Sequence, residues 1–509
     1  MSAHSHRRRF LQSASAFGLG AGLVGSGLRA VTPARAEDLK VGPDAVRFRP
    51  EIEPVVRWIE ETPRDRIFDV ALEQLKAGLS YRDLLAGVFL AAIRNVQPRP
   101  VGFKFHAVLV VNSAHLLAQS AAEDDRLLPL LWALDNFKNS QMQDIKEGDW
   151  TLSRVDEAHL PGPGEAKAKF VEAMDAWDVD AADAATASLC RSKGAGEVME
   201  AFWRYGVRDQ RDIGHKAIFT MQCWRTLQSI GWPNAEPVLR SLAYGLLDPG
   251  GDKNPEPVGP YHSNLERAKT IRDGWTVGRL DVGATEDMLQ ALREASPEDS
   301  SQKAAELVNA GIAPDSLWDA IVLGASELMM RSPGIVALHS MTASNALHYI
   351  FEASGDDTTR KMALLQAAGW IPLYRQRAQN GKDVRIDHLE PKTPDTKGDE
   401  AVGEIFADLG NDRIQAARKV IGYLDQGGSA QDVFAGMRSL VFRKGRDSHQ
   451  YKYGAASWEE CLLSSNDRWR GPLAASTLLY VPGSDQPDSP LMNRARDAVK
   501  RVFEARTTG

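Results

Sequence analysis

The side chains best suited to chemistry near the end of the chain are His449 and Lys452, in the stretch "RDSHQYKYGAASWEEC" (446–461). The spacing of apolar residues here predicts a helix, in which positions three apart lie on the same face. An ammonium group repels both a protonated imidazole and a metal ion. Either Lys452 extends its ammonium to solvent along an aliphatic stem, or its charge has been removed.

Five further histidines lie in apolar surroundings with helical spacing: His106, His115, His215, His339 and His348. A histidine in an apolar helix is usually a core residue satisfied by one hydrogen bond. Less often it binds a metal through one neutral imidazole nitrogen. Several such histidines in one helical protein favour a metal site, because helical bundles build these sites from side chains on facing helices. The chain has no HExxH motif, no GxSxG elbow and no GxxxxGK phosphate loop.

Apolar residues recur with helical spacing along nearly the whole chain, for example in 82–96, 124–141 and 315–331. Strands with a period of two are scarce. The sequence therefore predicts an all-α fold, a multi-helical bundle or an array of helical hairpins. Polar stretches that contain proline, near 249–300 and 376–402, are interpreted as long loop insertions. We expect one helical domain over 37–509, because the histidine-bearing segments lie on both sides of each insertion.

The N-terminal 36 residues have the pattern of a twin-arginine export signal. Arg7 and Arg8 in "HRRRFLQ" precede a weakly apolar, glycine-rich stretch, and "PARA" suggests cleavage after Ala36. This predicts a periplasmic or secreted protein that uses the twin-arginine translocation machinery. That route carries folded proteins, so a cofactor can be loaded before export.

The overall charge excludes one large class of partner. The net charge is −7, and five of the arginines lie in the first 36 residues. The remainder is therefore more acidic still, and it lacks the basic footprint of a nucleic-acid-binding protein. Beyond the N-terminus, no apolar run is long enough to span a bilayer.

Four segments resemble the questin oxidase-like family, in the order in which that family has them. They are "FHAVLVVNSAHLLAQSAAEDDRL" (105–127), "GHKAIFTMQCW" (214–224), "LHSMTASNALHYIFEASGDDTTRKMALLQAAGWIPLY" (338–374) and "DSHQYKYGAASWEEC" (447–461). Each segment carries a histidine on an expected apolar helix, and the last carries an H-x-x-K pair. The family is all-α, and some of its members are non-haem iron dioxygenases that cleave a ring of an anthraquinone.

The resemblance implies a specific set of metal ligands. Carried over residue by residue, these are His106, His215, His339, His449 and a carboxylated Lys452. The resemblance leaves open whether His106 or His115 is the first ligand. Carboxylation would convert the lysine amine into an oxygen anion that can bind Fe(II), with a coordination position left for dioxygen.

The resemblance thus implies an exported, mononuclear non-haem iron oxygenase that acts on an aromatic or polyketide-like small molecule. Imidazole also suits zinc, so a zinc-dependent hydrolase with the same ligands is an alternative. A non-catalytic helical binding scaffold, with its histidines scattered, is another. The substrate, the metal and the oligomeric state are left open by the sequence.

Overall fold

The computed structural model describes residues 44–250, 256–257, 259–378 and 381–504. Helices make up 71% of it, and the described part contains no strand, only two isolated β-bridges, Ala45–Ser153 and Arg279–Ile312. The predicted all-α fold is confirmed. Among the described helices, none combines the length and the apolar character needed to cross a membrane. The predicted export signal, 1–36, lies outside the described residues.

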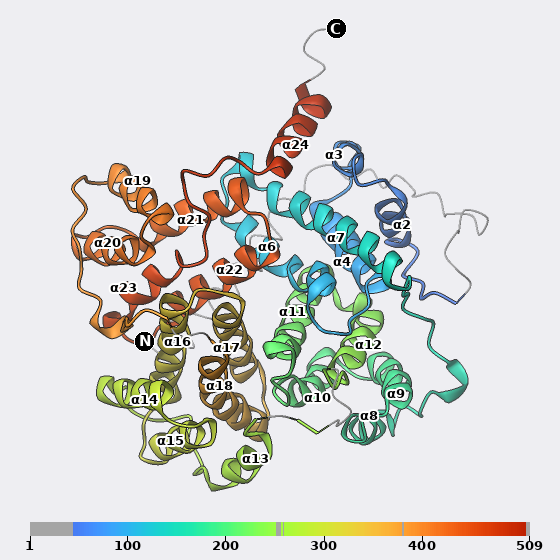
Figure 1. The fold of residues 1–509 in the computed structure, drawn as a ribbon. Coiled ribbons are helices and arrows are strands. Elements are labelled where there is room, and N and C mark those ends of the chain that lie inside the picture. Colours follow the sequence, from blue (N-terminus) through green and yellow to red (C-terminus); the bar gives the residue numbers. More distant parts are fainter. Residues whose placement is uncertain (1–43, 251–255, 258, 379–380, 505–509) are drawn as a thin grey trace. The chain divides into compact units, whose positions relative to one another are not determined.

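The described chain forms two compact units, whose helices are labelled in Figure 1 where there is room. Unit 1 comprises residues 203–221 and 256–489, and unit 2 comprises the described residues of 44–202, 222–255 and 490–504. Two helices, α10 (Ala195–Gly206) and α11 (His215–Ile230), contribute to both units. The single-domain expectation for 37–509 remains a prediction.

The helices of unit 2 are α2 (Glu53–Glu61), α3 (Ile67–Lys76), α4 (Tyr81–Asn95), α5 (His106–Leu109), α6 (Val111–Gln119), α7 (Leu128–Glu147), α8 (Ala166–Asp175), α9 (Val179–Ser192), α12 (Ala235–Leu246) and α24 (Pro490–Val499). Those of unit 1 are α13 (Tyr261–Thr270), α14 (Val282–Glu294), α15 (Pro297–Asn309), α16 (Pro314–Arg331), α17 (Ile335–Ala353), α18 (Asp357–Arg377), α19 (Asp399–Ala407), α20 (Arg413–Asp425), α21 (Ala430–Lys444), α22 (Ser448–Leu463) and α23 (Asp467–Ser476). Short turns of helix are η2 (Phe103–Phe105), η3 (Glu123–Asp125), η4 (Glu157–His159), η5 (Asp212–Gly214), η6 (Trp232–Asn234), η7 (Ile386–His388), η8 (Asp408–Gly410) and η9 (Lys500–Glu504).

The prediction of a loop insertion over 249–300 was wrong for most of its length. This segment contains α13, α14 and the beginning of α15. Local capping favours helices in this segment. The side chains of Asp281 and Ser296 accept hydrogen bonds from backbone N–H groups at the starts of α14 and α15. The other predicted insertion, 376–402, is largely irregular between the end of α18 and the start of α19.

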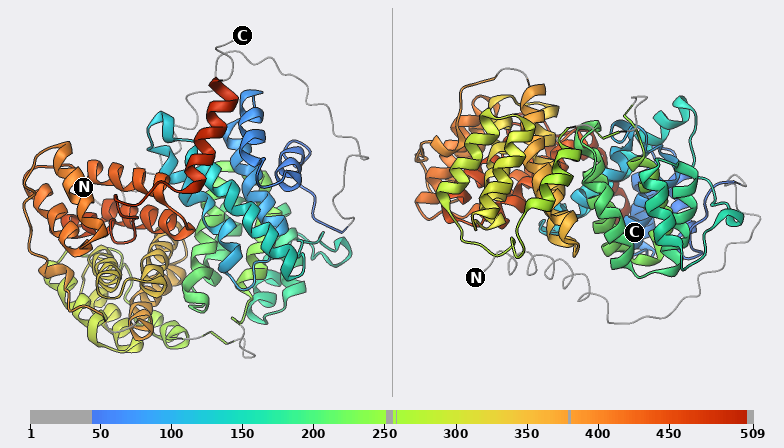
Figure 2. Two further views of the ribbon diagram at one scale, coloured as in Figure 1. Left: turned by 45° about the horizontal axis from the view of Figure 1, so that its top comes forward. Right: turned by 90° about the horizontal axis from the view of Figure 1, so that it is seen from below.

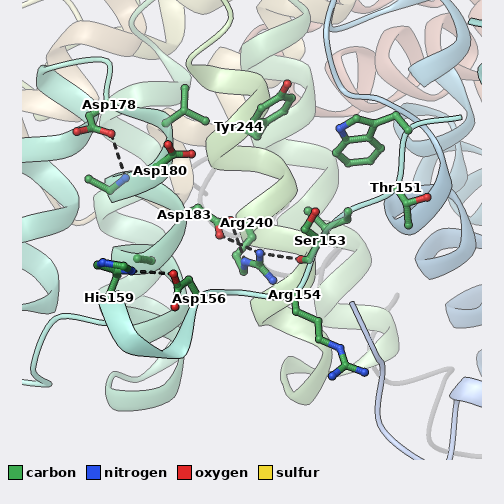
Figure 3. A pocket seen from close by; sticks show the side chains of 15 residues that line it. Thr151, Ser153, Arg154, Asp156, His159, Asp178, Asp180, Asp183, Arg240 and Tyr244 are labelled. Atoms are coloured by element: carbon green, nitrogen blue, oxygen red, sulfur yellow. Dashed lines mark hydrogen bonds and ion pairs between the residues drawn. The ribbon is translucent and has the colours of Figure 1, made fainter. Parts of the chain in front are cut away.

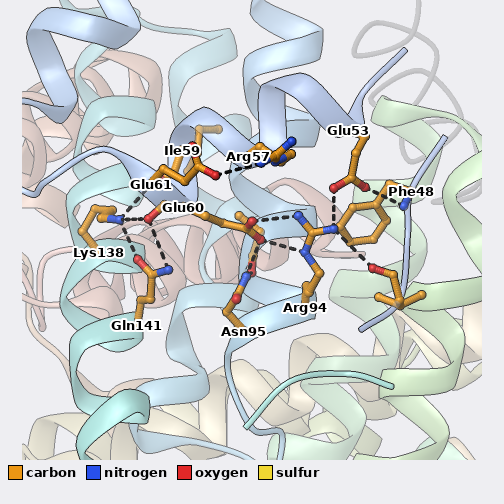
Figure 4. A network of polar contacts seen from close by, with 12 residues as sticks. Phe48, Glu53, Arg57, Ile59, Glu60, Glu61, Arg94, Asn95, Lys138 and Gln141 are labelled. Atoms are coloured by element: carbon orange, nitrogen blue, oxygen red, sulfur yellow. Dashed lines mark hydrogen bonds and ion pairs between the residues drawn. The ribbon is translucent and has the colours of Figure 1, made fainter. Parts of the chain in front are cut away.

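A buried ion network ties the first helices of unit 2 together (Figure 4). Arg94 on α4 is only 1% exposed. Its Nη1 lies 2.7 Å from Glu53 Oε1 and its Nη2 lies 2.7 Å from Glu60 Oε2, so one guanidinium pairs with two carboxylates of α2. Lys138 on α7 donates to the backbone carbonyl of Glu60 at 2.7 Å. Because each buried charge has a partner, the network fixes α2, α4 and α7 without leaving an orphan ion.

We predict that Arg94→Met destabilises the protein by about 3–5 kcal/mol, because it leaves Glu53 and Glu60 buried without their counter-ion. Urea unfolding followed by circular dichroism measures the change. Lys169→Met is the matched control, since Lys169 pairs with Glu172 on the surface of α8, and it should change stability by less than about 0.5 kcal/mol. Equal midpoints for the two variants would contradict the prediction.

Helix α17 forms the core of unit 1. It packs against α16, α18 and α22 (Figures 1 and 2), and residues 337–351 are all buried.

A buried carboxylate links α16 to the segment that precedes α23. The carboxylate of Asp319 accepts hydrogen bonds from the backbone N–H of Ser465 at 3.1 Å and from its hydroxyl at 2.6 Å. Burial raises the pKa of Asp319 from its ordinary 3.8 to about 6.

This shift predicts a pH dependence of stability. The folded state holds the Asp319 proton more tightly than the unfolded state, so the contribution is complete below about pH 4 and is lost as the pH rises through about 6. A pKa difference of about two corresponds to roughly 3 kcal/mol. Asp319→Asn, which cannot ionise, should therefore gain stability relative to the natural protein between pH 4 and pH 7. Urea titrations at several pH values test this, and a constant difference between the two proteins would contradict it.

Candidate metal centre

His215 is presented by a strained turn at the start of α11. The three residues before it all have left-handed backbones: Asp212 at φ 57°, Ile213 at φ 50° and Gly214 at φ 81°. For residues other than glycine such a conformation costs about 1–3 kcal/mol each, and it persists only where the surroundings enforce it. Here the hydroxyl of Tyr374 on α18 donates to the carbonyl of Ile213 at 2.9 Å, and η5 packs on α17.

The strained turn also sets the tautomer of His215. Its Nδ1 lies 2.6 Å from the carbonyl oxygen of Asp212. A carbonyl can only accept, so Nδ1 carries the proton and Nε2 carries the lone pair. On α17, His339 makes the same kind of contact, with Nδ1 2.7 Å from the carbonyl oxygen of Ile335. A histidine whose far nitrogen is fixed by a carbonyl is typical of metal sites.

The two rings meet through the nitrogens that carry lone pairs. His339 Nε2 lies 2.9 Å from His215 Nε2, with the ring centroids 4.4 Å apart. Both side chains are buried, at 0% and 4% exposure. Two lone pairs at this distance repel each other unless a cation lies between them. An extra proton would turn one ring into a buried imidazolium, which a dry core strongly disfavours.

His449 and Lys452 approach the same pair from α22. The ring centroids of His339 and His449 are 5.1 Å apart. Burial first, and then the charge of Lys452, lower the pKa of His339 well below its ordinary value. Lys452 is 2% exposed, and its Nζ has no hydrogen-bond partner among the described residues. The side chain of Lys452 therefore does not extend to solvent. Burial lowers the pKa of its amine to about 7.

A polar clamp that the sequence did not reveal holds α17 and α22 in register. The amide Nδ2 of Asn345 donates to Glu459 Oε2 at 2.9 Å and to Glu460 Oε1 at 2.7 Å. His348 Nδ1 lies 2.7 Å from the other oxygen of Glu460, and its ring stacks on Trp318. Adjacent acids in the otherwise apolar "GAASWEEC" were the available signal, because buried carboxylates require partners.

His106 belongs to unit 2, and its ring, like that of His215, is fixed by a backbone carbonyl three residues earlier. Its Nδ1 lies 2.7 Å from the carbonyl oxygen of Phe103, a residue at φ 47° three positions earlier. In contrast, the Nδ1 of His115 lies 3.2 Å from the hydroxyl of Tyr81, and burial lowers the pKa of His115 to about 4. His106 rather than His115 thus has the ring orientation of a ligand.

In unit 1, the buried side chains of His215 and His339 could share a metal ion. Unit 1 by itself brings together His215, His339, His449 and Lys452. The participation of His106 stays a prediction from the sequence.

No protein-family model, curated protein or solved structure matched the chain. The resemblance to questin oxidase-like proteins therefore stays a prediction, and the centre is described from the residues of this chain alone.

The turn before His215 leaves no room for a side chain at Gly214. A Cβ there would lie 2.5 Å from Tyr374 Oη and 2.7 Å from Ala343 Cβ. We predict that Gly214→Ala destabilises the protein by roughly 2–5 kcal/mol, because it adds a steric clash to backbone strain. Gly427→Ala is the matched control: Gly427 has a similar φ of 85° with nothing within 4 Å, so only the strain of about 1–2 kcal/mol applies. Thermal or urea unfolding measures both, and equal losses would contradict the prediction.

Proposed function

We propose that unit 1 binds a single metal ion through His215, His339 and His449. The facing Nε2 atoms of His215 and His339, 2.9 Å apart, carry this proposal. Imidazole nitrogens bind at about 2.0–2.1 Å from a metal, so two neighbouring ligands at a right angle lie about 3 Å apart. The observed separation fits that donor set, and a metal cation would relieve the repulsion between the lone pairs.

We further propose that Lys452 contributes an anionic ligand after carboxylation. Its buried amine lacks a hydrogen-bond partner in the described part of the chain, so the ammonium form is costly at this position. The neutral amine would attack the carbon of carbon dioxide and form an N–C bond. The electrons of one C=O π bond would move to oxygen, and one amine proton would leave. The product carboxylate has an oxygen anion that can bind a cation, and this explains a lysine beside three histidines.

The metal that we propose is Fe(II), and the reaction an oxygenation of an aromatic or polyketide-like small molecule. The donor set is compatible with iron, copper, nickel or zinc, and the choice of iron rests on the family resemblance. When bound, Fe(II) supplies the one-electron chemistry through which dioxygen reacts with an organic substrate. The residues of the chain keep the site dry and fix the rings of His215 and His339 through backbone carbonyls. Export by the twin-arginine route would allow metal loading before translocation.

Metal content of single variants tests the centre. We predict that His215→Ala, His339→Ala and His449→Ala each lower bound metal at least roughly tenfold, because each removes a ligand. His262→Ala, an exposed histidine of unit 1 that pairs with Glu256, should keep full occupancy. His106→Ala tests the predicted contribution of unit 2. Elemental analysis after anaerobic purification provides the measurement, with circular dichroism to confirm folding.

The Lys452 series separates a carboxylated ligand from an ordinary lysine. Lys452→Ala and Lys452→Arg should both lose metal, since a guanidinium stays protonated and takes up no carbon dioxide. Lys452→Glu should restore part of it by supplying an oxygen anion, and added bicarbonate should help only the natural protein. Full occupancy in the Arg variant would end the carboxylation proposal. Stoichiometric zinc without iron, or no dioxygen uptake by the iron-loaded protein with a hydroxylated anthraquinone, would end the oxygenase proposal.

A further inference from the structure

A cavity of about 830 Å³ lies wholly within unit 2, among residues that play no part in the metal centre. It is lined by the segment 150–159, the first turn of α9 and two residues of α12 (Figure 3). Its volume falls within the range of about 300–1,000 Å³ that is typical of small-molecule sites.

The buried guanidinium of Arg240 is one wall of this cavity. Arg240 is 2% exposed. Its Nε and Nη2 each donate to the carboxylate of Asp183 at 2.8 Å, and Nη2 also donates to the carbonyl of Ser153 at 2.9 Å. Figure 3 shows this fork. The remaining nitrogen, Nη1, has no hydrogen-bond partner within the part of the chain that the structure describes. This nitrogen is itself fully buried, so Arg240 shapes the wall by holding Asp183 and Ser153 rather than by contacting a ligand.

Aromatic rings and exposed carboxylates complete the cavity. Trp150 and Tyr244 stack with their centroids 6.1 Å apart and 29° between their planes, and both side chains are half-buried. Asp156 and Asp180 are exposed. The lining includes four aspartates against two arginines, so its formal charge of −2 disfavours anions.

We propose that this cavity binds a neutral saccharide of one or two rings. Sugar hydroxyls can donate to the carboxylates of Asp156 and Asp180, which are exposed acceptors. The apolar C–H face of a pyranose suits the face of Trp150, as aromatic rings provide apolar contact area. An anionic ligand would face four aspartates against two arginines.

Saturation-transfer NMR and titration calorimetry on the full protein test the proposal. The probes are glucose, N-acetylglucosamine and cellobiose, with glucuronate as the charged comparison. We expect at least one neutral probe to bind and glucuronate to bind more weakly. Trp150→Leu and Asp180→Asn should each weaken binding by roughly tenfold, as the loss of a stacking face or of an acceptor for a ligand hydroxyl predicts.

Glu172→Gln, an exposed substitution on the neighbouring α8, should leave the affinity unchanged. Both cavity variants should keep their metal content, which separates this site from the proposed metal centre. The proposal is overturned if none of the neutral probes binds at millimolar concentration. It is equally overturned if glucuronate binds as well as glucose, or if binding survives both substitutions in proteins that circular dichroism shows to be folded.

Discussion

Two neutral imidazoles that face each other through their lone pairs repel each other unless a cation lies between them. In a dry core, no solvent weakens this repulsion. The 2.9 Å contact between His215 and His339 imposes this constraint on unit 1. Several other features maintain it. η5 packs on α17, Tyr374 holds the strained carbonyl, and the Asn345 clamp keeps α22 beside α17.

The strain before His215 has a clear structural purpose. A left-handed residue three positions before the histidine turns its carbonyl toward Nδ1, and this fixes both the ring and its tautomer. The same arrangement precedes His106 in unit 2, where Phe103 has the left-handed backbone. Because such conformations are costly, their occurrence before two different histidines indicates that the orientation of each imidazole ring is important.

Buried basic side chains have different partners in the two units. In unit 2, Arg94 lies between the carboxylates of Glu53 and Glu60, and each of the three has an ion-pair partner. In unit 1, Lys452 is equally buried, but its amine has no hydrogen-bond partner among the described residues. The first arrangement stabilises a fold. The second is costly while the amine is charged, and burial accordingly lowers its pKa to about 7.

Local patterns in the sequence were enough to predict several features. Helical periodicity predicted the all-α fold. The shared approach of His449 and Lys452 followed from their spacing on one helix. The error over 249–300 arose because the loop indicated by the prolines and glycines near 249–260 was extended to the following segment. The capping residues of that segment begin new helices.

Tertiary structure alone decided which histidines meet. His215 and His339 are 124 positions apart, and no local pattern specifies their contact, since it depends on how η5 and α18 pack against α17. The left-handed turns and the unsatisfied nitrogen of Arg240 were likewise not predictable from the sequence. The adjacent acids Glu459 and Glu460 indicated a buried polar contact, but not that Asn345 would be the partner. Periodicity reports which face of a helix is buried. The partner that the face meets depends on the packing of elements far apart in the chain, where side-chain shape and polar satisfaction decide between the alternatives.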